Sequence, residues 1–476
     1  MTDNIDDAER AFREAGARIE WFGPSLSRGD SGGQPEPPEH SDDALALAFS
    51  DRYLGHWLFC AEWGAWLAWD GSRWAFDKTR NVDDLARVIC REAAAKAAHT
   101  THGGQEHALA RIASRQKVAA VVMLASADRR HARKADDFDA DPWVLNTPDG
   151  VVDLKTGERR PHAGGDLFTK VTAVAPGGDC PRWLRFLAEI LRDDAEALAY
   201  VQRWAGYALT GSTREHAFMF LYGPGGNGKS VLLNTLAHVM GDYATSADMD
   251  LFTVNSGNSH PTGLADLRGA RLVLAQETEQ GRALAEAKIK GMTGGDRQKA
   301  RFMRQDFFEF LPVFKLVMAG NHRPVIRNPD DAMRRRLHLL PLTYKPEAPD
   351  RDLAEALRDE APGILAWAIA GCLAWQRDRL GDCAVMRAAT GEYFAEQDLV
   401  AQWLTERCEP SRGEVPSTAL FRDWQVYAKD RGEEAGTQKA FSAALERYHA
   451  KRRTNGGMVF IGLRLRSSDT GVCHGP

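Results

Sequence analysis

The sequence predicts an α/β fold of about three domains, and three observations lead to this prediction. The chain has 476 residues, whereas a domain usually holds about 100–200. Strand-like and helix-like segments alternate from residue 217 to about 344, the pattern of a parallel sheet covered by helices. The flanking regions lack this alternation. We therefore expect a mixed α/β domain before it, and a helical segment with a small further domain after it.

The composition is that of a globular protein, with 43% hydrophobic and 27% charged residues. No apolar run approaches about 18 residues, and the start MTDNIDDAER lacks a signal segment, so we expect neither a membrane span nor secretion. The seven cysteines form no Cys-x-x-Cys pair, which excludes a zinc ribbon and suits a reducing cytoplasm. Because the net charge is −5, any binding to nucleic acid must use local basic segments.

The N-terminal region is expected to hold an arm and one domain. Residues 1–40 are rich in Gly, Pro and acidic side chains, which predicts a flexible arm. Residues 41–195 are expected to form the mixed α/β domain. In it, Trp-rich strands with a hairpin turn at Asp70-Gly71 come first, helices follow, and short strands return at 142–162.

A glycine-rich loop stands at the start of the alternating region. It joins an apolar strand at 218–222 to a helix with apolar periodicity, which is the context of a Walker A motif. The glycines let backbone N–H groups surround phosphates, Lys229 can reach the β- and γ-phosphates of ATP, and the Ser230 hydroxyl can ligate Mg²⁺. The residues expected to bind the nucleotide are Gly223, Pro224, Gly225, Gly226, Asn227, Gly228, Lys229 and Ser230.

Polar side chains follow two further strands of the expected sheet. Glu277 and Glu279 come after the apolar run 272–275, at the strand end where open α/β sheets bind ligands. Glu277 could hold Mg²⁺ or polarise the attacking water, and Glu279 is the second candidate for this role. The alternative is that both acids belong to a solvated loop. Asn321 ends the next strand, where a neutral amide can orient water without repelling phosphate.

Three adjacent arginines precede the last apolar strand of this region. Arg334, Arg335 and Arg336 cannot all face inward from a strand, so a solvated face is one interpretation. The other is that one or two of them act as arginine fingers on the nucleotide of a neighbouring subunit.

These motifs, in this order between residues 223 and 342, resemble those of superfamily 3 helicases, which are ring-forming AAA+-type motors of viruses, phages and plasmids. More narrowly, the segments 142–162 and 203–230 are similar to the phage/plasmid and poxvirus helicase–primase family. The resemblance implies a helicase-associated domain over 41–195, a P-loop AAA+-like ATPase domain over 196–345 that uses ATP and Mg²⁺, and a helical segment over 346–407.

Site roles follow from the resemblance by position. Glu277 matches the Walker B acid, which with Ser230 would hold Mg²⁺, and Asn321 matches the sensor asparagine. Arg335 and Arg336 match the arginine-finger region. One departure concerns the acids: many family members pair two adjacent acids, whereas here Thr278 separates Glu277 from Glu279.

The family also places a DNA-gripping β-hairpin between the Walker B and sensor strands. Here residues 288–304 hold six basic side chains against one acid. Basic groups on a moving loop can hold phosphates without regard to sequence. The alternative is a solvated edge hairpin kept soluble by its charge. The residues expected to contact DNA are Lys288, Lys290, Arg297, Lys299 and Arg301.

The C-terminal region 408–476 is expected to form a winged-helix domain. A helix with Leu420, Trp424 and Tyr427 on one face is followed by a second helix capped by Thr437 and then by a strand pair, which is the order of a winged helix. Winged helices bind DNA or proteins, and both uses stay open. The residues expected to contact DNA are Lys439, Arg452 and Arg453.

The expected function is ATP-driven unwinding of DNA in phage, prophage or plasmid replication, by a homo-oligomeric, hexameric ring in the bacterial cytoplasm. A separate primase is an expected partner. An alternative is a replication initiator or loader that uses ATP as a switch and does not unwind processively. A P-loop kinase of small molecules is disfavoured, because it would need neither tandem arginines nor a basic hairpin.

Overall fold

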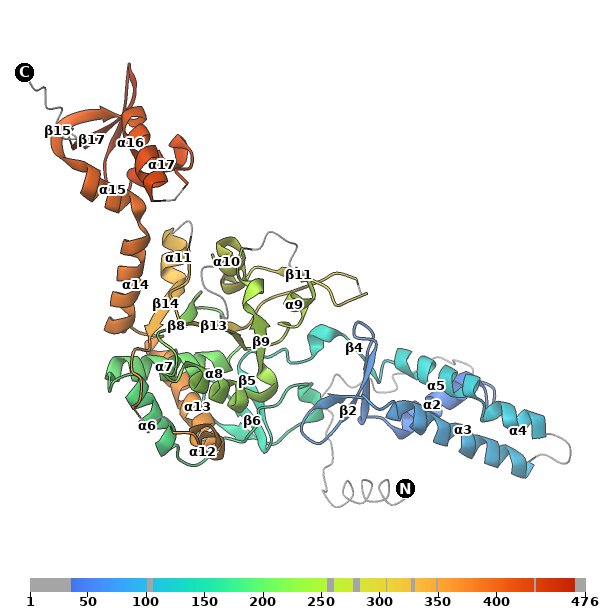
Figure 1. The fold of residues 1–476 in the computed structure, drawn as a ribbon. Helices are drawn as coiled ribbons and strands as arrows, with labels where there is room; N and C mark the ends of the chain where they lie inside the picture. The colour runs from blue at the N-terminus through green and yellow to red at the C-terminus, as the bar shows by residue number, and fades with distance from the viewer. Residues whose placement is uncertain are drawn as a thin grey trace, which may run out of the picture.

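The computed structural model describes residues 36–100, 106–254, 261–276, 283–304, 306–326, 330–347, 350–431 and 434–466. It has an N-terminal lobe, a central lobe and a C-terminal lobe along an elongated molecule (Figure 1). The predicted mixed α/β class is confirmed. Within the described ranges, none of the helices combines the length and the apolar character needed to cross a bilayer.

The N-terminal lobe is a small sheet packed with helices, in the strand order β3-β2-β1-β4. Its buried aromatic side chains include Phe49, Trp57 and Trp66. The hairpin expected at Asp70-Gly71 joins β2 and β3, and Gly71 has a φ of 99°, which favours glycine. The elements are α2 (Asp42–Arg52), β1 (Trp57–Cys60), β2 (Ala65–Trp69), β3 (Trp74–Phe76), α3 (Asn81–Thr100), α4 (Glu106–Ile112), α5 (Arg115–Ala127) and β4 (Ala132–Arg133).

A second small sheet joins this lobe to the central one. It consists of β5 (Val144–Thr147), β6 (Gly150–Asp153) and β7 (Arg159–Arg160). Leu145 and Leu154 belong to the same core cluster as Trp183 and strand β8. The expected domain boundary at residue 195 therefore does not coincide with a gap between cores, because the strands at 144–160 bury their apolar side chains against the central lobe.

The central lobe is built on a five-stranded sheet of order β14-β8-β13-β10-β9. All its strand pairs are parallel, as the alternating pattern predicted. Strands β14, β8, β13 and β10 are apolar on both faces, since alternate residues enter two different cores, whereas the edge strand β9 is partly exposed. In β8, Met219 and Leu221 face one core, and Phe218 and Phe220 face the other. The strands are β8 (Phe218–Tyr222), β9 (Ala244–Asp248), β10 (Leu272–Gln276), β13 (Lys315–Gly320) and β14 (Leu337–Pro341).

Helices cover both faces of this sheet (Figure 1). One set packs on the face with Met219: α6 (Pro181–Ile190), α7 (Ala195–Leu209), α8 (Lys229–Met240), α12 (Leu353–Asp359) and α13 (Ala361–Asp378). The other set packs on the face with Phe218: α9 (Pro261–Ala265), α10 (Glu286–Gly294), α11 (Asp331–Arg336) and α14 (Ala384–Gln397), together with the hairpin of β11 (Gln298–Ala300) and β12 (Phe308–Phe310).

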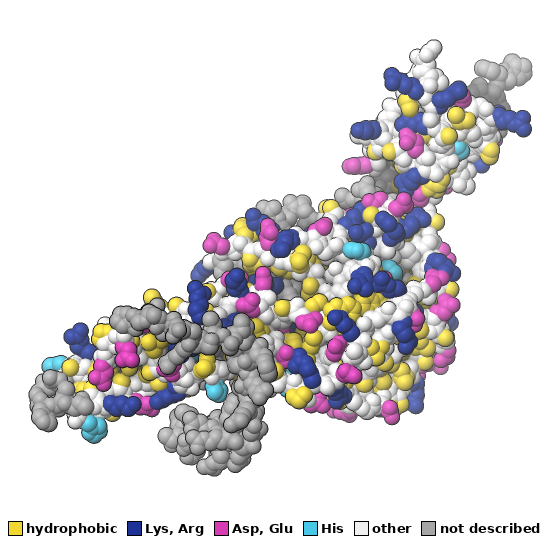
Figure 2. Space-filling model, turned by 180° about the vertical axis from the view of Figure 1, so that it is seen from behind, with side chains coloured by type: hydrophobic (Ala, Val, Ile, Leu, Met, Phe, Trp, Pro, Cys, Tyr) yellow, Lys and Arg dark blue, Asp and Glu magenta, His cyan; other side chains and the backbone are white. Residues whose placement is uncertain are grey.

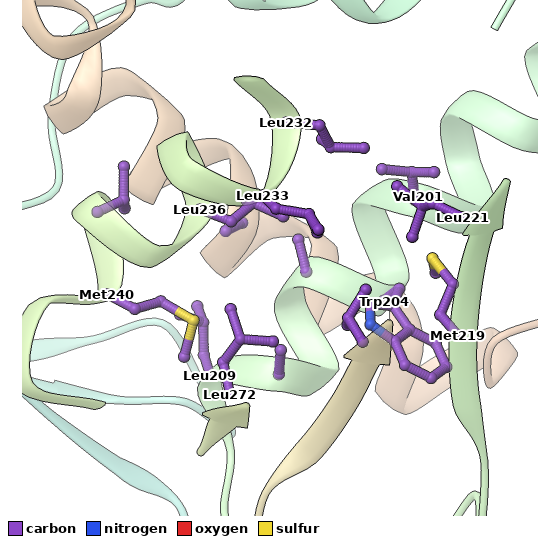
Figure 3. Close-up of a pocket in the computed structure, with 15 residues that line it drawn as sticks. Val201, Trp204, Leu209, Met219, Leu221, Leu232, Leu233, Leu236, Met240 and Leu272 are labelled. Carbon is purple, nitrogen blue, oxygen red and sulfur yellow. The ribbon is translucent and has the colours of Figure 1, made fainter. Parts of the chain in front are cut away.

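An apolar cavity lies inside the first of these layers (Figure 3). Val201 and Trp204 of α7, Leu233 of α8 and Met219 of β8 are among the side chains that line it. Because the lining is apolar, the cavity is suited neither to phosphate nor to a metal ion, and it is a feature of core packing.

The C-terminal lobe has a core of its own, around Trp403, Trp424, Phe441 and Phe460. Trp403 lies on α15, so this core includes residues before the expected boundary at 408. The predicted buried face of Leu420, Trp424 and Tyr427 is confirmed, as is the Thr437 cap. The elements are α15 (Leu399–Arg407), β15 (Cys408–Pro416), α16 (Ser417–Asp430), α17 (Gln438–Leu445), β16 (Lys451–Thr454) and β17 (Gly457–Leu465), with the sheet order β15-β17-β16.

Candidate nucleotide site and nucleic-acid surfaces

The glycine-rich loop connects β8 to the start of α8, as its motif predicts. Gly223 has a φ of 147°, and a Cβ atom there would lie 2.0 Å from the carbonyl oxygen of Leu342. Gly228 has a φ of 85° and packs against Phe186 and Ile190 of α6. The loop can therefore keep this path only with glycine at both positions.

Lys229 lies at the centre of the loop and is 8% exposed. Its amine donates to the carbonyl oxygens of Gly223 at 2.6 Å and Pro224 at 3.1 Å, and to Asn227 Oδ1 at 3.0 Å. Burial lowers the pKa of Lys229. All three acceptors are neutral, so they leave the positive charge of the ammonium group unbalanced. Phosphate oxygens that replaced them would compensate this charge.

The outer part of the loop is open. Pro224, Gly225 and Gly226 are exposed, and no atom lies within 4 Å of a Cβ built on Gly225. The Ser230 side chain is exposed beside this opening. Open backbone, a buried lysine and an adjacent hydroxyl are together the donor set that a nucleoside triphosphate with Mg²⁺ requires.

Asn227 differs from the exposed residues of the loop in its burial and its contacts. It is 1% exposed, and its amide donates to the carbonyl oxygen of Leu342, just beyond β14, while its Oδ1 accepts from Lys229. It was expected among the nucleotide-binding residues. Its side-chain contacts fix the loop to the sheet and hold the lysine, and its part in nucleotide binding stays a prediction.

Asn321 lies at the same edge of the sheet as the loop. Gly320, the last residue of β13, is in register with Tyr222, the last residue of β8. Asn321 and Gly223 therefore leave neighbouring strands at the same level, and Asn321 is exposed there. Glu277 and Glu279 lie outside the described residues; the last described residue of β10, Gln276, is in register with Ala319 of β13.

The three arginines are on helix α11 and not on a strand, so that expectation was wrong. Asp330 caps this helix by accepting from the backbone N–H of Met333 at 2.8 Å, a local signal that starts a helix immediately before the arginines. Arg335 is exposed, whereas Arg336 is partly buried and its Nε has no hydrogen-bond partner among the described residues. Arg334 lies 5.1 Å from the ring of Phe394 on α14.

The basic segment 288–304 is part helix and part hairpin. Lys288 and Lys290 lie on α10, where the Lys290 amine forms an ion pair with Asp330 at 2.5 Å. Both were expected on a hairpin. The expectation failed because charge does not reveal secondary structure, whereas Gly294-Gly295, with a φ of 81° at Gly295, marks the end of a helix.

The hairpin itself carries Lys299 on β11 and Arg301 just beyond it. Both lie against Phe307, with Lys299 Nζ at 5.2 Å and Arg301 Cζ at 4.7 Å from the ring centroid. Phe307 is 51% exposed. Sequence reasoning missed it, although an aromatic residue within a basic segment is a known signal of single-strand binding. Arg297 is exposed before β11.

The C-terminal lobe also carries basic side chains on its surface (Figure 2). Lys439 is exposed on α17 and Arg453 on β16. Arg452 is exposed as well, but its guanidinium forms an ion pair with Glu414 on β15, which lowers its availability for DNA. These residues lie on the helix and the strand pair that the winged-helix prediction assigned to DNA.

Two family models match parts of the chain. Residues 46–192 match the model described as D5 N terminal like. Residues 221–336 match a family of unknown function, DUF5906. The second match runs from the end of β8 through α11, so it covers the glycine-rich loop, Asn321 and the arginines.

Curated relatives are proteins of large DNA viruses. A proposed helicase of Acanthamoeba polyphaga mimivirus is 27% identical over 216 residues, which are 44% of this chain and 22% of that protein. A proposed helicase of Invertebrate iridescent virus 6 is 27% identical over 241 residues, 47% of this chain and 25% of that protein. A proposed primase of African swine fever virus is 24% identical over 215 residues, which are 42% of this chain and 22% of that protein. Over these stretches the chain is similar to viral proteins that are described as helicases or as primases. The matches span only about a quarter of the length of these relatives.

Among solved structures, the apo C-terminal region of NrS-1 aligns with 90% of this chain and 100% of its own, with a TM-score of 0.48 and 10% identity. A second structure of this region has a TM-score of 0.48 and 11% identity, over 90% of this chain and 99% of its own.

Proposed function

We propose that this chain is the motor of an ATP-driven DNA helicase that serves phage, prophage or plasmid replication. The observation that carries the proposal is the shared edge of the central sheet, where the glycine-rich loop with its buried Lys229 stands beside Asn321. Ligands of open α/β sheets bind at such carboxyl ends. The kinship with proposed viral helicases supports unwinding as the purpose of hydrolysis.

In this proposal, backbone N–H groups of the loop bind phosphate oxygens, and Lys229 turns its amine from Gly223 and Pro224 to the β- and γ-phosphates of ATP. Asn321 orients the attacking water from the adjacent strand end. Ser230 and Glu277, with Glu279 as the alternative acid, would hold Mg²⁺, which neutralises charge on the phosphates when bound.

The proposed active form is a homo-oligomeric AAA+-type ring, a hexamer by resemblance to superfamily 3. An exposed arginine on α11 would complete the site of the neighbouring subunit. Arg335 is the better candidate, because Arg336 is partly buried against its own subunit. The hairpin cations Lys299 and Arg301 would grip the tracked strand, and Phe307 would stack on its bases.

The C-terminal lobe is proposed to be a winged helix that binds DNA during loading. Lys439 of α17 and Arg453 of β16 support this proposal, because they are exposed on the two elements that contact DNA in winged helices. A separate primase would supply primers.

The test replaces Lys229 by alanine. Steady-state ATP hydrolysis should fall by about 100-fold or more, because the variant lacks the cation that stabilises phosphate charge. The control Lys78→Ala removes an exposed lysine of the N-terminal lobe and should keep wild-type turnover. Equal turnover of Lys229→Ala and wild type would refute the ATPase assignment. Wild-type hydrolysis that DNA does not accelerate, without displacement of a forked duplex, would instead support the initiator alternative.

A further inference from the structure

The turn after β13 is held by helix α14. Arg323, two residues beyond Asn321, forms ion pairs with Glu396 at 2.7 Å and with Glu392 at 3.8 Å. The hydroxyl of Tyr393 donates to the carbonyl oxygen of Pro324 at 2.5 Å. Two different kinds of contact therefore tie the turn that carries Asn321 to one face of α14.

The same helix also contacts α11, which carries the tandem arginines, and β14, the strand that follows α11. The Thr390 hydroxyl accepts from the backbone N–H of Leu339 on β14 at 3.3 Å. Phe394 lies under the guanidinium of Arg334 on α11. A displacement of α14 would thus move both the water-orienting turn and the arginine helix.

Helix α14 continues into the C-terminal lobe (Figure 1). Asp398 ends α14 and caps α15 by accepting from the backbone N–H of Ala401 at 3.0 Å. Its other carboxylate oxygen accepts from the hydroxyl of Tyr448, which follows α17. The junction between the helices is therefore braced by the C-terminal lobe, so that a shift of that lobe reaches α14.

We propose that α14 couples nucleotide binding to DNA binding by the C-terminal lobe, with Arg323 and Tyr393 as positioning residues for Asn321. The inference rests on the proposed function. Arg323 is 27% and Glu396 is 62% exposed, so water screens their attraction and the pair adds little to stability. Such a pair can open and close with the state of the lobe. By linkage, nucleotide must then change DNA affinity by the same factor by which DNA changes nucleotide affinity.

The experiment measures the dissociation constant of duplex DNA with and without AMP-PNP and Mg²⁺. The wild-type ratio should be about fivefold or more. In Glu396→Gln combined with Tyr393→Phe, the ratio should approach one, with each partner still bound. Arg323→Glu should lose the coupling as well, and adding Glu396→Arg should restore part of it, which a merely structural role would not produce.

The matched control is Asp382→Asn, which removes an exposed ion pair with Arg387 on the same helix, away from the turn. It should keep the wild-type ratio. In ATPase assays the variants that lose the coupling should also lose kcat. Their KM should stay within about twofold, because in the proposal Asn321 orients water and does not bind the nucleotide. A wild-type ratio of one, or variants that keep the wild-type ratio, would overturn the inference. Failure of the proposed function would differ: the coupling would persist without hydrolysis.

Discussion

At the scale of single residues, the glycine-rich loop distinguishes positions that need glycine for shape from positions that need it for access. Gly223 has a backbone that L-residues avoid and no space for a side chain. Gly225 has space, and its φ lies outside the left-handed region. The motif contains both kinds of glycine, and the sequence alone does not distinguish them.

Gly223→Ala should therefore lower the free energy of unfolding by about 2–4 kcal/mol, through backbone strain and the clash with Leu342. Gly225→Ala should leave it within about 0.5 kcal/mol of the wild type, because nothing opposes its methyl group. Chemical denaturation of both variants measures the difference. Equal stability of the two would show that the loop relaxes around a Cβ at residue 223.

His338 predicts a dependence of stability on pH. It lies on β14 with Nδ1 bonded to the Tyr200 hydroxyl, and burial lowers its pKa to about 4. The unfolded chain binds a proton near pH 6.5, so the folded state loses stability as the pH falls from about 6.5 to 4. The loss should reach on the order of 3 kcal/mol, and His338→Phe should lack that part of it. Parallel unfolding curves of the two proteins across this range would contradict the pKa.

At the scale of elements, the basic segment 288–304 belongs partly to helix α10 and partly to the hairpin of β11 and β12. The part on α10 is oriented by an ion pair with Asp330, whereas the part on the hairpin surrounds an exposed aromatic ring. The number of basic residues in the sequence gives no sign that residues 288–304 divide between a helix and a hairpin. The structure separates a helix that packs on the sheet from a hairpin that projects cations.

Lys299→Ala with Arg301→Ala should keep DNA-free ATP hydrolysis and reduce strand displacement. The salt slope of single-strand binding should become shallower by roughly 0.7 for each phosphate that the variant no longer binds. Lys290→Ala is the matched control: it removes a lysine of the same segment that lies on α10 and should keep the wild-type salt slope. Unwinding of a forked duplex at the wild-type rate by the hairpin variant would make the segment a solvated edge.

At the scale of the whole molecule, the proposal divides one site between two subunits. The exposed Arg335 stands on α11, and Lys229 lies in the loop after β8. A ring with heterologous interfaces would let the arginine of one subunit serve the loop of the next.

Mixing inactive Lys229→Ala and Arg335→Ala subunits should restore up to about a quarter of wild-type hydrolysis, the share of interfaces with an intact loop and an intact arginine. Mixing Lys229→Ala with Ser230→Ala is the control and should restore none, because both changes affect the loop side. A lack of recovery in the first mixture, although both proteins assemble, would remove the support for a shared site.

The features of this protein that could be predicted from its sequence are those that depend on local chemistry. The strand–loop–helix around Lys229, the Thr437 cap and the turn at Asp70-Gly71 were all predictable, because glycine conformation, capping and apolar periodicity act over a few neighbouring residues. The same local signals placed Asn321 at a strand end.

How these parts meet depends on the packing of the whole chain. The strands at 144–160 share a core with the sheet that carries the glycine-rich loop, Lys290 and Lys299 lie on different elements, and α14 bridges the turn after Asn321 to the C-terminal lobe. Such contacts join residues far apart in the chain, and their partners are set by packing of whole faces. The sequence does not indicate that Glu396 and Arg323 form an ion pair, because surface carboxylates and surface arginines are common. Only the fold makes these two residues neighbours.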